Sequence, residues 1–217
     1  MPYIYRMCEA VLDVVLPLKE RAARTKKRTI DQIPLIPTPH DLLGARITTL
    51  MDYRNPEVQD LVQSLKYDKS AHAALLCAEV LSDYLREEIS SQKTFSPRNI
   101  FLIPVPLHKK RARERGYNQI GIVLARLPQE FQSGPNAILA PALLSRTRET
   151  KQQTRLSRLE RLSNVAGAFE VTDSDAIKGA HIYLIDDVTT TGATLVNAAR
   201  PLRAAGANVT LIALARA

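Results

Sequence analysis

The residues with the clearest chemical potential lie in one segment, from Asp186 to Thr194. Two adjacent carboxylates, Asp186 and Asp187, follow an apolar run, and the chain continues as Val188, Thr189, Thr190, Thr191, Gly192, Ala193 and Thr194. A helix that starts in this segment would direct backbone N–H groups and the positive end of its dipole at a bound anion. The threonine hydroxyls would add hydrogen-bond donors. The segment therefore predicts a phosphate-binding loop.

The two carboxylates need a different partner, because they would repel a phosphate placed against them. Sugar hydroxyls suit them, since a carboxylate accepts hydrogen bonds from neutral donors. Carboxylates that bind two sugar hydroxyls, next to a loop that binds a phosphate, would together form a site for ribose 5-phosphate. The segment lacks the Gly-Lys-Ser/Thr of a Walker loop. The alternative interpretation is an ordinary strand followed by a capped helix, with the acids there by chance.

The pattern around this segment alternates strands with helices. Strand-like runs cover residues 100–105, about 138–144, 181–185 and 209–215, and helices are predicted over about 117–126 and 192–205. This alternation predicts an α/β protein with a mostly parallel sheet and helices on both faces. Ligands of such sheets bind beyond the carboxyl ends of the strands, which is where Asp186 and Asp187 stand.

Helix signals also mark the region before the first of these strands. Asn55 followed by Pro56 is typical of a helix start, and a second helix is expected over about 70–90. A polar linker, 90–99, then leads into the sheet region. Further along, Gly206 sits where the C-terminal cap of a helix would need a positive φ.

These segments divide the chain into two parts. Residues 1–40 are expected to form an N-terminal helix over 3–16 and a basic, proline-rich connector. Residues 41–217 are expected to form one domain, with a helical hood region at about 41–98 and a core at about 99–217. The length of 217 residues suits a single well-buried core with a small accessory element.

Composition and charge narrow the class of protein. The hydrophobic fraction of 45% indicates a folded chain, and no apolar run reaches the roughly 18 residues that a membrane span needs. We therefore expect a cytoplasmic protein without a membrane span. The formal net charge is +8, and 16 of the 30 Lys and Arg fall in the segments 21–28, 109–115 and 146–161. Each of these segments is a candidate contact for an anionic partner.

The segment from Tyr183 to Thr194 resembles the signature of type I phosphoribosyltransferases. Within that fold the chain is most similar to the ComF/GntX family, and the resemblance covers about residues 47–217. The residues that carry it are Pro104-Val-Pro-Leu-His108, Arg115-Gly-Tyr-Asn-Gln119, and Gln153, Leu156, Arg161 and Asn164 leading into Gly167-Ala-Phe169. The resemblance implies a type I phosphoribosyltransferase-like fold that binds phosphoribosyl pyrophosphate.

The resemblance also assigns roles to site residues. Asp186, Asp187 and Arg115 are implied as catalytic residues, and residues 188–194 as the loop for the 5-phosphate. The implied pyrophosphate loop contributes Lys109, Gly116 and Asn118, and the implied closing loop contributes Arg148, Gln153 and Arg161. Other interpretations stay open, because the basic turn could be solvated and the segment 146–164 could be a helix that faces nucleic acid.

The resemblance further implies Mg²⁺, bound with the substrate and taking few ligands from the protein. No zinc is expected, because Leu16 to Arg24 stands where the family commonly carries the cysteines of a zinc ribbon. Cys8 and Cys77 lie far apart and form no CxxC, so they are interpreted as buried residues. The basic run 21–28 is interpreted as a solvated linker, with electrostatic replacement of the ribbon as the alternative.

Three functions compete. The first is a phosphoribosyltransferase that transfers the ribosyl 5-phosphate group to an unknown nitrogen acceptor. The second is a non-catalytic competence or DNA-uptake accessory protein that binds single-stranded DNA or DNA-processing proteins, although the chain has no Trp and only four Phe for base stacking. The third is a phosphohydrolase that uses Asp186 and Asp187 to hold metal, and the phosphate-binding loop after the acids argues against it.

Overall fold

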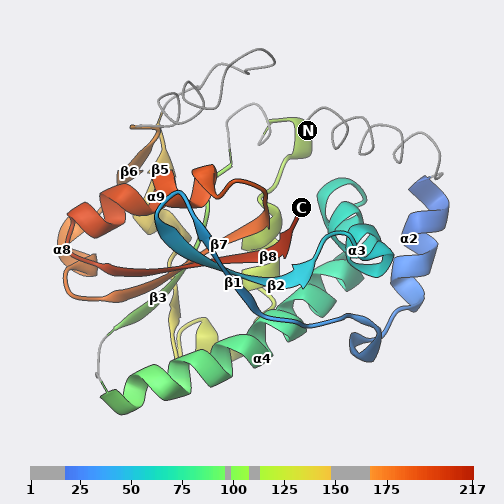
Figure 1. The fold of residues 1–217 in the computed structure, drawn as a ribbon, viewed down its shortest axis with the longest axis horizontal. Helices are drawn as coiled ribbons and strands as arrows, with labels where there is room; N and C mark the ends of the chain where they lie inside the picture. Colours follow the sequence, from blue (N-terminus) through green and yellow to red (C-terminus); the bar gives the residue numbers. More distant parts are fainter. Residues whose placement is uncertain (1–17, 96–98, 108–112, 148–166) are drawn as a thin grey trace.

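The fold is described from a computed structural model, which covers residues 18–95, 99–107, 113–147 and 167–217. The helix predicted over 3–16 lies outside these residues. In chain order the described elements are α2 (Leu18–Lys27), η1 (Ile30–Gln32), β1 (Thr38–Leu42), β2 (Ala45–Asp52), α3 (Pro56–Tyr67), α4 (Ala71–Phe95), β3 (Ile100–Pro104), α6 (Gln119–Leu124), η2 (Gln129–Phe131), β4 (Ile138–Leu139), η3 (Pro141–Leu143), β5 (Leu144–Arg146), β6 (Phe169–Val171), α8 (Ser174–Ile177), β7 (His181–Thr189), α9 (Ala193–Ala204) and β8 (Asn208–Arg216) (Figure 1).

The described strands form a six-stranded central sheet in the order β1-β2-β8-β7-β3-β4. Every neighbouring pair is parallel except β1 and β2, which form an antiparallel hairpin at one edge. A second, two-stranded sheet pairs β5 with β6. The predicted α/β class with a mostly parallel sheet is confirmed.

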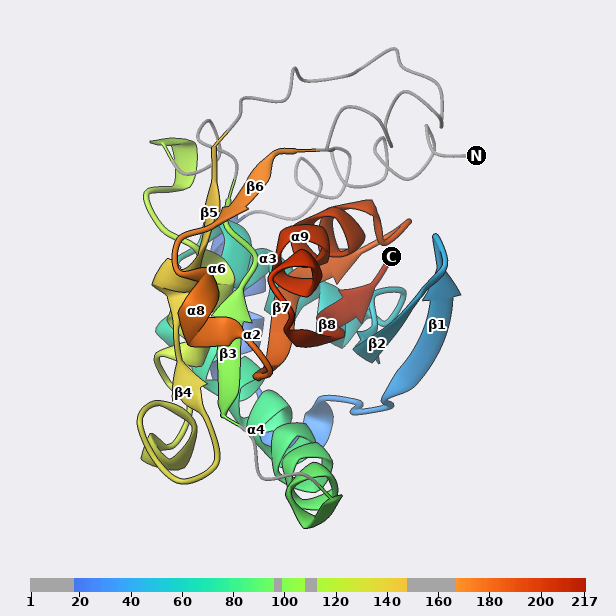
Figure 2. The same ribbon diagram turned by 90° about the vertical axis from the view of Figure 1, so that its left-hand side faces the viewer.

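The sheet is buried on both faces, as its near-continuous apolar strands require. On one face Tyr183 and Ile185 of β7 join a core with α3, α4 and α6. On the other face Ile182 and Leu184 of β7 join a core with α8 and α9. Figure 1 shows α9 above the sheet and α4 below it, and Figure 2 shows the same layers from the side. The two cores fix β7 in the centre of the molecule.

Local helix signals in the sequence match the structure. The Asn55 side chain caps α3, because its Oδ1 accepts a hydrogen bond of 2.9 Å from the backbone N–H of Glu57. Pro56 occupies the first turn of that helix, where its missing N–H costs nothing. Gly206 follows α9 with a φ of 88°. The predictions of a helix start at Asn55 and a positive φ at Gly206 are confirmed.

Several predicted boundaries differ from the structure. The run 138–144 divides into β4, η3 and β5, because Pro141 interrupts the strand. The linker expected over 90–99 is shorter, since α4 continues to Phe95. Residues 45–52, assigned above to the helical hood region, instead form β2 and pair with β8 inside the central sheet.

The predicted strand 181–185 was too short. β7 continues through both acids to Thr189, with Asp186 opposite Ala213, Val188 opposite Ala215 and Thr189 opposite Arg216. β8 is equally long and offers a backbone partner at each of these positions. β-branched Val188 and Thr189 also favour an extended chain. The acids are therefore held by sheet hydrogen bonds rather than by a loop.

The helices in the described part of the chain bear on the absence of a membrane span. None of its helices is both long and apolar enough to cross a bilayer.

Candidate functional site

The acid pair lies in the last part of β7, at the carboxyl edge of the parallel strands. The Asp186 Oδ1 accepts a hydrogen bond of 2.9 Å from the backbone N–H of Asp187, whose Oδ1 in turn accepts one from the N–H of Val188. Both acids are partly exposed. Their backbone is fixed by the sheet while their side chains reach solvent, as a site for sugar hydroxyls requires.

Lys66, from the last turn of α3, reaches the second acid. Its Nζ lies 3.6 Å from the Asp187 Oδ2, and the two side chains are 12% and 16% exposed. The sequence does not indicate this residue, because nothing near Lys66 relates it to a strand far along the chain. The ion pair brings the helical region into the candidate site.

The predicted phosphate-binding segment divides into three parts. Val188 and Thr189 end β7, and Thr189 is only 5% exposed. Residues 190–192 form the turn, in which the side chains of Thr190 and Thr191 are exposed. Residues 193 and 194 begin α9, whose N–H groups have no helical partner at this end. The turn and the helix start therefore carry the donors available to an anion.

Gly192 is required at the helix start for two reasons. Its φ is 79°, in the left-handed region that favours glycine. A Cβ atom here would also lie 2.6 Å from the Ile47 Cδ1 and 3.0 Å from the Leu42 Cβ. The turn is thus pressed against the edge hairpin β1–β2, and only a residue without a side chain fits.

The predicted pyrophosphate segment lies beside the last turn of α3. The Tyr117 hydroxyl donates to the backbone carbonyls of Leu65 and Lys66, at 2.9 and 3.2 Å. The Arg115 Cζ lies 5.3 Å from the centre of the Tyr67 ring. The structure therefore brings the Arg115 segment and the Asp187 carboxylate to the same helix turn, through Tyr117 and Lys66 respectively.

Two other residues predicted for this segment have defined places. Gly116 is exposed and has a φ of 76°. The Asn118 side chain caps α6, because its Oδ1 accepts from the N–H of Gly121 at 3.2 Å, and its Nδ2 donates to the Val105 carbonyl at 3.0 Å. Asn118 therefore holds the segment against the end of β3, and both of its polar side-chain atoms are engaged in doing so.

Four predicted site residues lie outside the described residues. They are Lys109 of the pyrophosphate loop and Arg148, Gln153 and Arg161 of the closing loop. The described part of the closing segment begins in β5, which pairs with β6 as a two-stranded ribbon. The Arg146 guanidinium at the end of β5 lies 5.1 Å from the centre of the Phe169 ring in β6.

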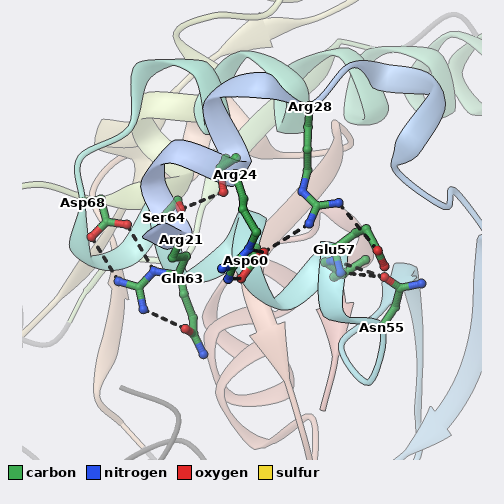
Figure 3. A network of polar contacts seen from close by, with 11 residues as sticks. Arg21, Arg24, Arg28, Asn55, Glu57, Asp60, Gln63, Ser64 and Asp68 are labelled. Carbon is green, nitrogen blue, oxygen red and sulfur yellow. Dashed lines mark hydrogen bonds and ion pairs between the residues drawn. The ribbon is translucent and has the colours of Figure 1, made fainter. Parts of the chain in front are cut away.

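The basic run 21–28 is not a solvated linker, so that interpretation was wrong. Residues 18–27 form helix α2, which packs on α3 through paired charges (Figure 3). Arg21 is 1% exposed and contacts Asp68 at 3.0 Å, while Arg24 and Arg28 share Asp60 at 2.9 and 3.1 Å. The acids of α3 and the turn that follows it pair with the three arginines of this run, whereas Lys26 and Lys27 are exposed. The sequence does not reveal this pairing, because the partners lie far apart in the chain.

The described histidines make structural hydrogen bonds. The His40 Nε2 lies 3.0 Å from the Thr49 hydroxyl, and the His181 Nε2 lies 3.0 Å from the Thr210 hydroxyl. The His72 Nε2 lies 2.8 Å from the Arg28 carbonyl.

Cys77 is fully buried, and burial together with the nearby Asp187 charge raises the pKa of its thiol to about 12. Among the described residues, no group of three or more His, Cys, Asp and Glu could hold a metal ion.

Comparison with curated proteins finds relatives over most of the chain. The DNA utilization protein YhgH of Escherichia coli O6:H1 is 30% identical over 201 residues, which cover 86% of this chain and 83% of that protein. The competence protein ComFC of Bacillus subtilis is 33% identical over 126 residues, covering 58% of this chain and 48% of that protein. Competence protein F of Haemophilus influenzae is 30% identical over 147 residues, covering 67% and 62%. No protein-family model matches the sequence.

Comparison with solved structures finds more distant similarity. A hypoxanthine phosphoribosyltransferase from Staphylococcus aureus aligns with a TM-score of 0.39 and 10% identity, covering 68% of this chain and 75% of that one. The orotate phosphoribosyltransferase of Mycobacterium tuberculosis aligns with a TM-score of 0.35 and 10% identity, covering 90% and 95%.

Proposed function

The chain belongs to the ComF/GntX family, and from this premise we propose that it binds phosphoribosyl pyrophosphate and transfers the ribosyl 5-phosphate group to a nitrogen acceptor. The observation that carries the proposal is the position of the last turn of α3. That turn contacts Asp187 through Lys66 and the Arg115 segment through Tyr117. Groups suited to the ribose and groups suited to the pyrophosphate therefore flank one helix turn.

Each part of the substrate has a chemically matched group. Asp186 and Asp187 accept hydrogen bonds from the ribose hydroxyls. The exposed hydroxyls of Thr190 and Thr191 and the N–H groups at the start of α9 bind the 5-phosphate. On the other side, the Arg115 guanidinium binds the pyrophosphate, because its planar donors match phosphate oxygens.

The reaction exchanges one bond at the ribose C1 for another. The C1–O bond breaks and its electron pair leaves with pyrophosphate, while the lone pair of the acceptor nitrogen forms the new C1–N bond and the nitrogen then loses a proton. The carboxylates stabilise the positive charge that develops on the ribose ring, and Arg115 stabilises the charge on departing pyrophosphate. Charge stabilisation of this kind needs fixed groups, and β7 and the last turn of α3 supply rigid supports for them.

Magnesium fits this site as a partner of the substrate. The described residues offer two adjacent carboxylates but no three-ligand cluster. An ion bound here would take most of its ligands from phosphate oxygens and water, as Mg²⁺ commonly does. When bound, Mg²⁺ would neutralise part of the pyrophosphate charge.

Calorimetric titration of the purified protein with phosphoribosyl pyrophosphate and Mg²⁺ tests the proposal. We expect saturable binding to the native chain and its loss in Asp186→Asn/Asp187→Asn. Asp173→Asn is the matched control, because it removes an exposed carboxylate that caps α8. Absence of binding to the native chain, or binding that survives in the double mutant, would contradict the proposal.

The relatives' names support a second candidate function, in which the chain is a DNA-processing accessory protein. YhgH is named for DNA utilization, and ComFC and competence protein F are named for competence. In this case basic residues would contact single-stranded DNA phosphates. The arginines of the run 21–28 contribute little to such a surface, because they are paired with acids.

DNA titration of the same double mutant separates the two functions. If DNA binds at a surface apart from the acid pair, Asp186→Asn/Asp187→Asn retains the affinity for a fluorescent single-stranded oligonucleotide, or increases it slightly because two negative charges are removed. A collapse of DNA affinity in the double mutant would mean that DNA and the ribosyl ligand share one site. Both titrations should be run at the same salt concentration.

A further inference from the structure

Within the described residues, the Arg115 guanidinium contacts an aromatic ring and forms no ion pair with an acid. Its Cζ lies 5.3 Å from the centre of the Tyr67 ring. Its Nη1 is buried and has no hydrogen-bond partner in the part of the chain that the structure describes. A buried N–H group without a partner costs free energy that an anionic ligand would recover. Arg115 is thus oriented by the ring, while one of its buried donors lacks a hydrogen-bond partner among the described residues.

Tyr67 is itself placed by helix α2. The Arg21 Cζ lies 5.9 Å from the centre of the Tyr67 ring, and Arg21 is 1% exposed. Arg21 donates to Asp68 at 3.0 and 3.2 Å and to the Gln63 side chain at 2.8 Å. Because these bonds fix Arg21, the ring next to it is restrained even though Tyr67 is 50% exposed.

We propose that Tyr67 is a positioning residue, which fixes the Arg115 guanidinium for a diphosphate ligand, and that α2 supports it through Arg21. This inference rests on the proposed function, since it concerns the pyrophosphate half of that site. A cation near an aromatic face is attracted to it, which restricts the rotamers of a long side chain before the ligand arrives. Restricting them in advance lowers the entropy lost on binding.

The inference assigns separate roles to neighbouring aromatic residues. Tyr117 acts through its hydroxyl, which donates to two carbonyls at the end of α3. No hydrogen bond from the Tyr67 hydroxyl is observed within the described residues, so its role rests on the ring. Tyr67→Phe should therefore retain the function, whereas Tyr67→Leu should lose it.

The experiment titrates the full chain with pyrophosphate and Mg²⁺, and separately with ribose 5-phosphate. We expect Tyr67→Leu to weaken pyrophosphate binding about fivefold, the change that loss of a cation–π contact brings. Tyr67→Phe should stay within about twofold of the native chain on the same scale. Ribose 5-phosphate affinity should not change in either variant. Tyr67→Met provides a second variant without a ring, and thermal melting checks that each variant folds.

A matched control removes a similar contact elsewhere. The Arg86 Cζ lies 5.8 Å from the centre of the Phe131 ring, where α4 meets η2. Arg86→Met should leave both affinities unchanged.

The outcomes separate the inference from the function on which it rests. Unchanged pyrophosphate affinity in Tyr67→Leu and Tyr67→Met would overturn the inference but not the proposed function. If these variants lost ribose 5-phosphate affinity as strongly as pyrophosphate affinity, Tyr67 would have a general structural role, and the inference would again be overturned. Loss of pyrophosphate affinity in Tyr67→Phe would also overturn it, because the hydroxyl would then be responsible. Failure of the native chain to bind either ligand would overturn the proposed function, and the inference with it.

Discussion

The Lys66 ammonium lies 3.6 Å from the Asp187 carboxylate, so the last turn of α3 is tied to the carboxyl end of β7 by a mostly buried ion pair. Removal of one partner leaves the other charge poorly solvated. Lys66→Met should lower the free energy of unfolding by about 1–3 kcal/mol. Lys178→Met, at an exposed lysine, should change it by less than about 0.5 kcal/mol. Urea denaturation monitored by circular dichroism measures both.

A double-mutant cycle shows whether the effect belongs to the ion pair. If Lys66 and Asp187 stabilise the chain through each other, Lys66→Met should cost less in an Asp187→Asn background than in the native chain. Equal costs in both backgrounds would assign the effect to packing of the lysine stem instead.

Asp60 accepts hydrogen bonds from two arginines, Arg24 of α2 and Arg28, which directly follows that helix. It accepts from Arg24 at 2.9 Å and from Arg28 at 3.1 Å, and its side chain is 10% exposed. Asp60→Asn should lower the free energy of unfolding by about 2–4 kcal/mol, because two cations lose their shared counter-charge. Asp83→Asn breaks the exposed pair with Arg86, and should cost less than about 1 kcal/mol. Similar losses in both variants would show that α2 is not anchored through Asp60.

Features that depend on neighbouring residues in the chain could be predicted from the sequence. The Asn55 cap and the positive φ at Gly206 both follow from short-range geometry, and both are observed. The order of apolar strand, two acids and small polar residues likewise indicated which strand end to examine. The strand itself ended later than predicted, since its last residues depend on pairing with β8.

Contacts between distant residues could not be predicted in this way. Arg21 and Asp68 are 47 residues apart, and Tyr117 and the Leu65 carbonyl are 52 apart. A run of five basic residues in eight has the same composition whether it is solvated or paired. Only the packing of α2 on α3 decides between these states. The contacts of Lys66 and Tyr67 could not be predicted for the same reason, because their partners come from other parts of the fold.

Gly192, directly before α9, has two constraints that mutation can separate: its left-handed backbone and the close packing around it. Gly192→Ala places a Cβ atom in a left-handed backbone and 2.6 Å from the Ile47 Cδ1. It should lower the free energy of unfolding by about 2–4 kcal/mol, from backbone strain and overpacking together. Gly206→Ala is the matched control. The φ of Gly206 is also positive, at 88°, but a Cβ atom added there would lie 3.6 Å from its nearest neighbour, the Lys178 Cγ. It should cost only about 1–2 kcal/mol.

Ligand binding provides a second measurement on the same glycine. The turn before α9 presents the proposed donors for the 5-phosphate, so displacement of the turn by Gly192→Ala should weaken ribose 5-phosphate binding about tenfold. Gly206→Ala lies at the other end of the helix and should leave that affinity unchanged. Equal behaviour of the two variants would argue against a role of the turn in phosphate binding.

Ionisation of the Cys77 thiol should make the free energy of unfolding depend on pH in the alkaline range. Burial raises the pKa of the thiol from 9.0 to about 12 in the folded chain. Between these values the unfolded chain releases the thiol proton and the folded chain keeps it, so the unfolded state binds fewer protons and stability falls as pH rises. The contribution of the protonated thiol to the free energy of unfolding is complete below pH 9. Above pH 9 it falls by about 1.4 kcal/mol per pH unit.

Cys77→Ala tests this contribution directly. Denaturation at pH 8, 9, 10 and 10.5 should show a smaller loss of stability in Cys77→Ala than in the native chain, by about 1 kcal/mol between pH 9 and 10. Burial also raises the pKa of Tyr84, to about 12, and that of Tyr183, so part of the alkaline loss should remain in the variant. Alkylation supplies an independent readout, because a thiol with a raised pKa reacts slowly as long as the chain is folded. Identical pH slopes in the native chain and Cys77→Ala would mean that the thiol ionises equally in both states.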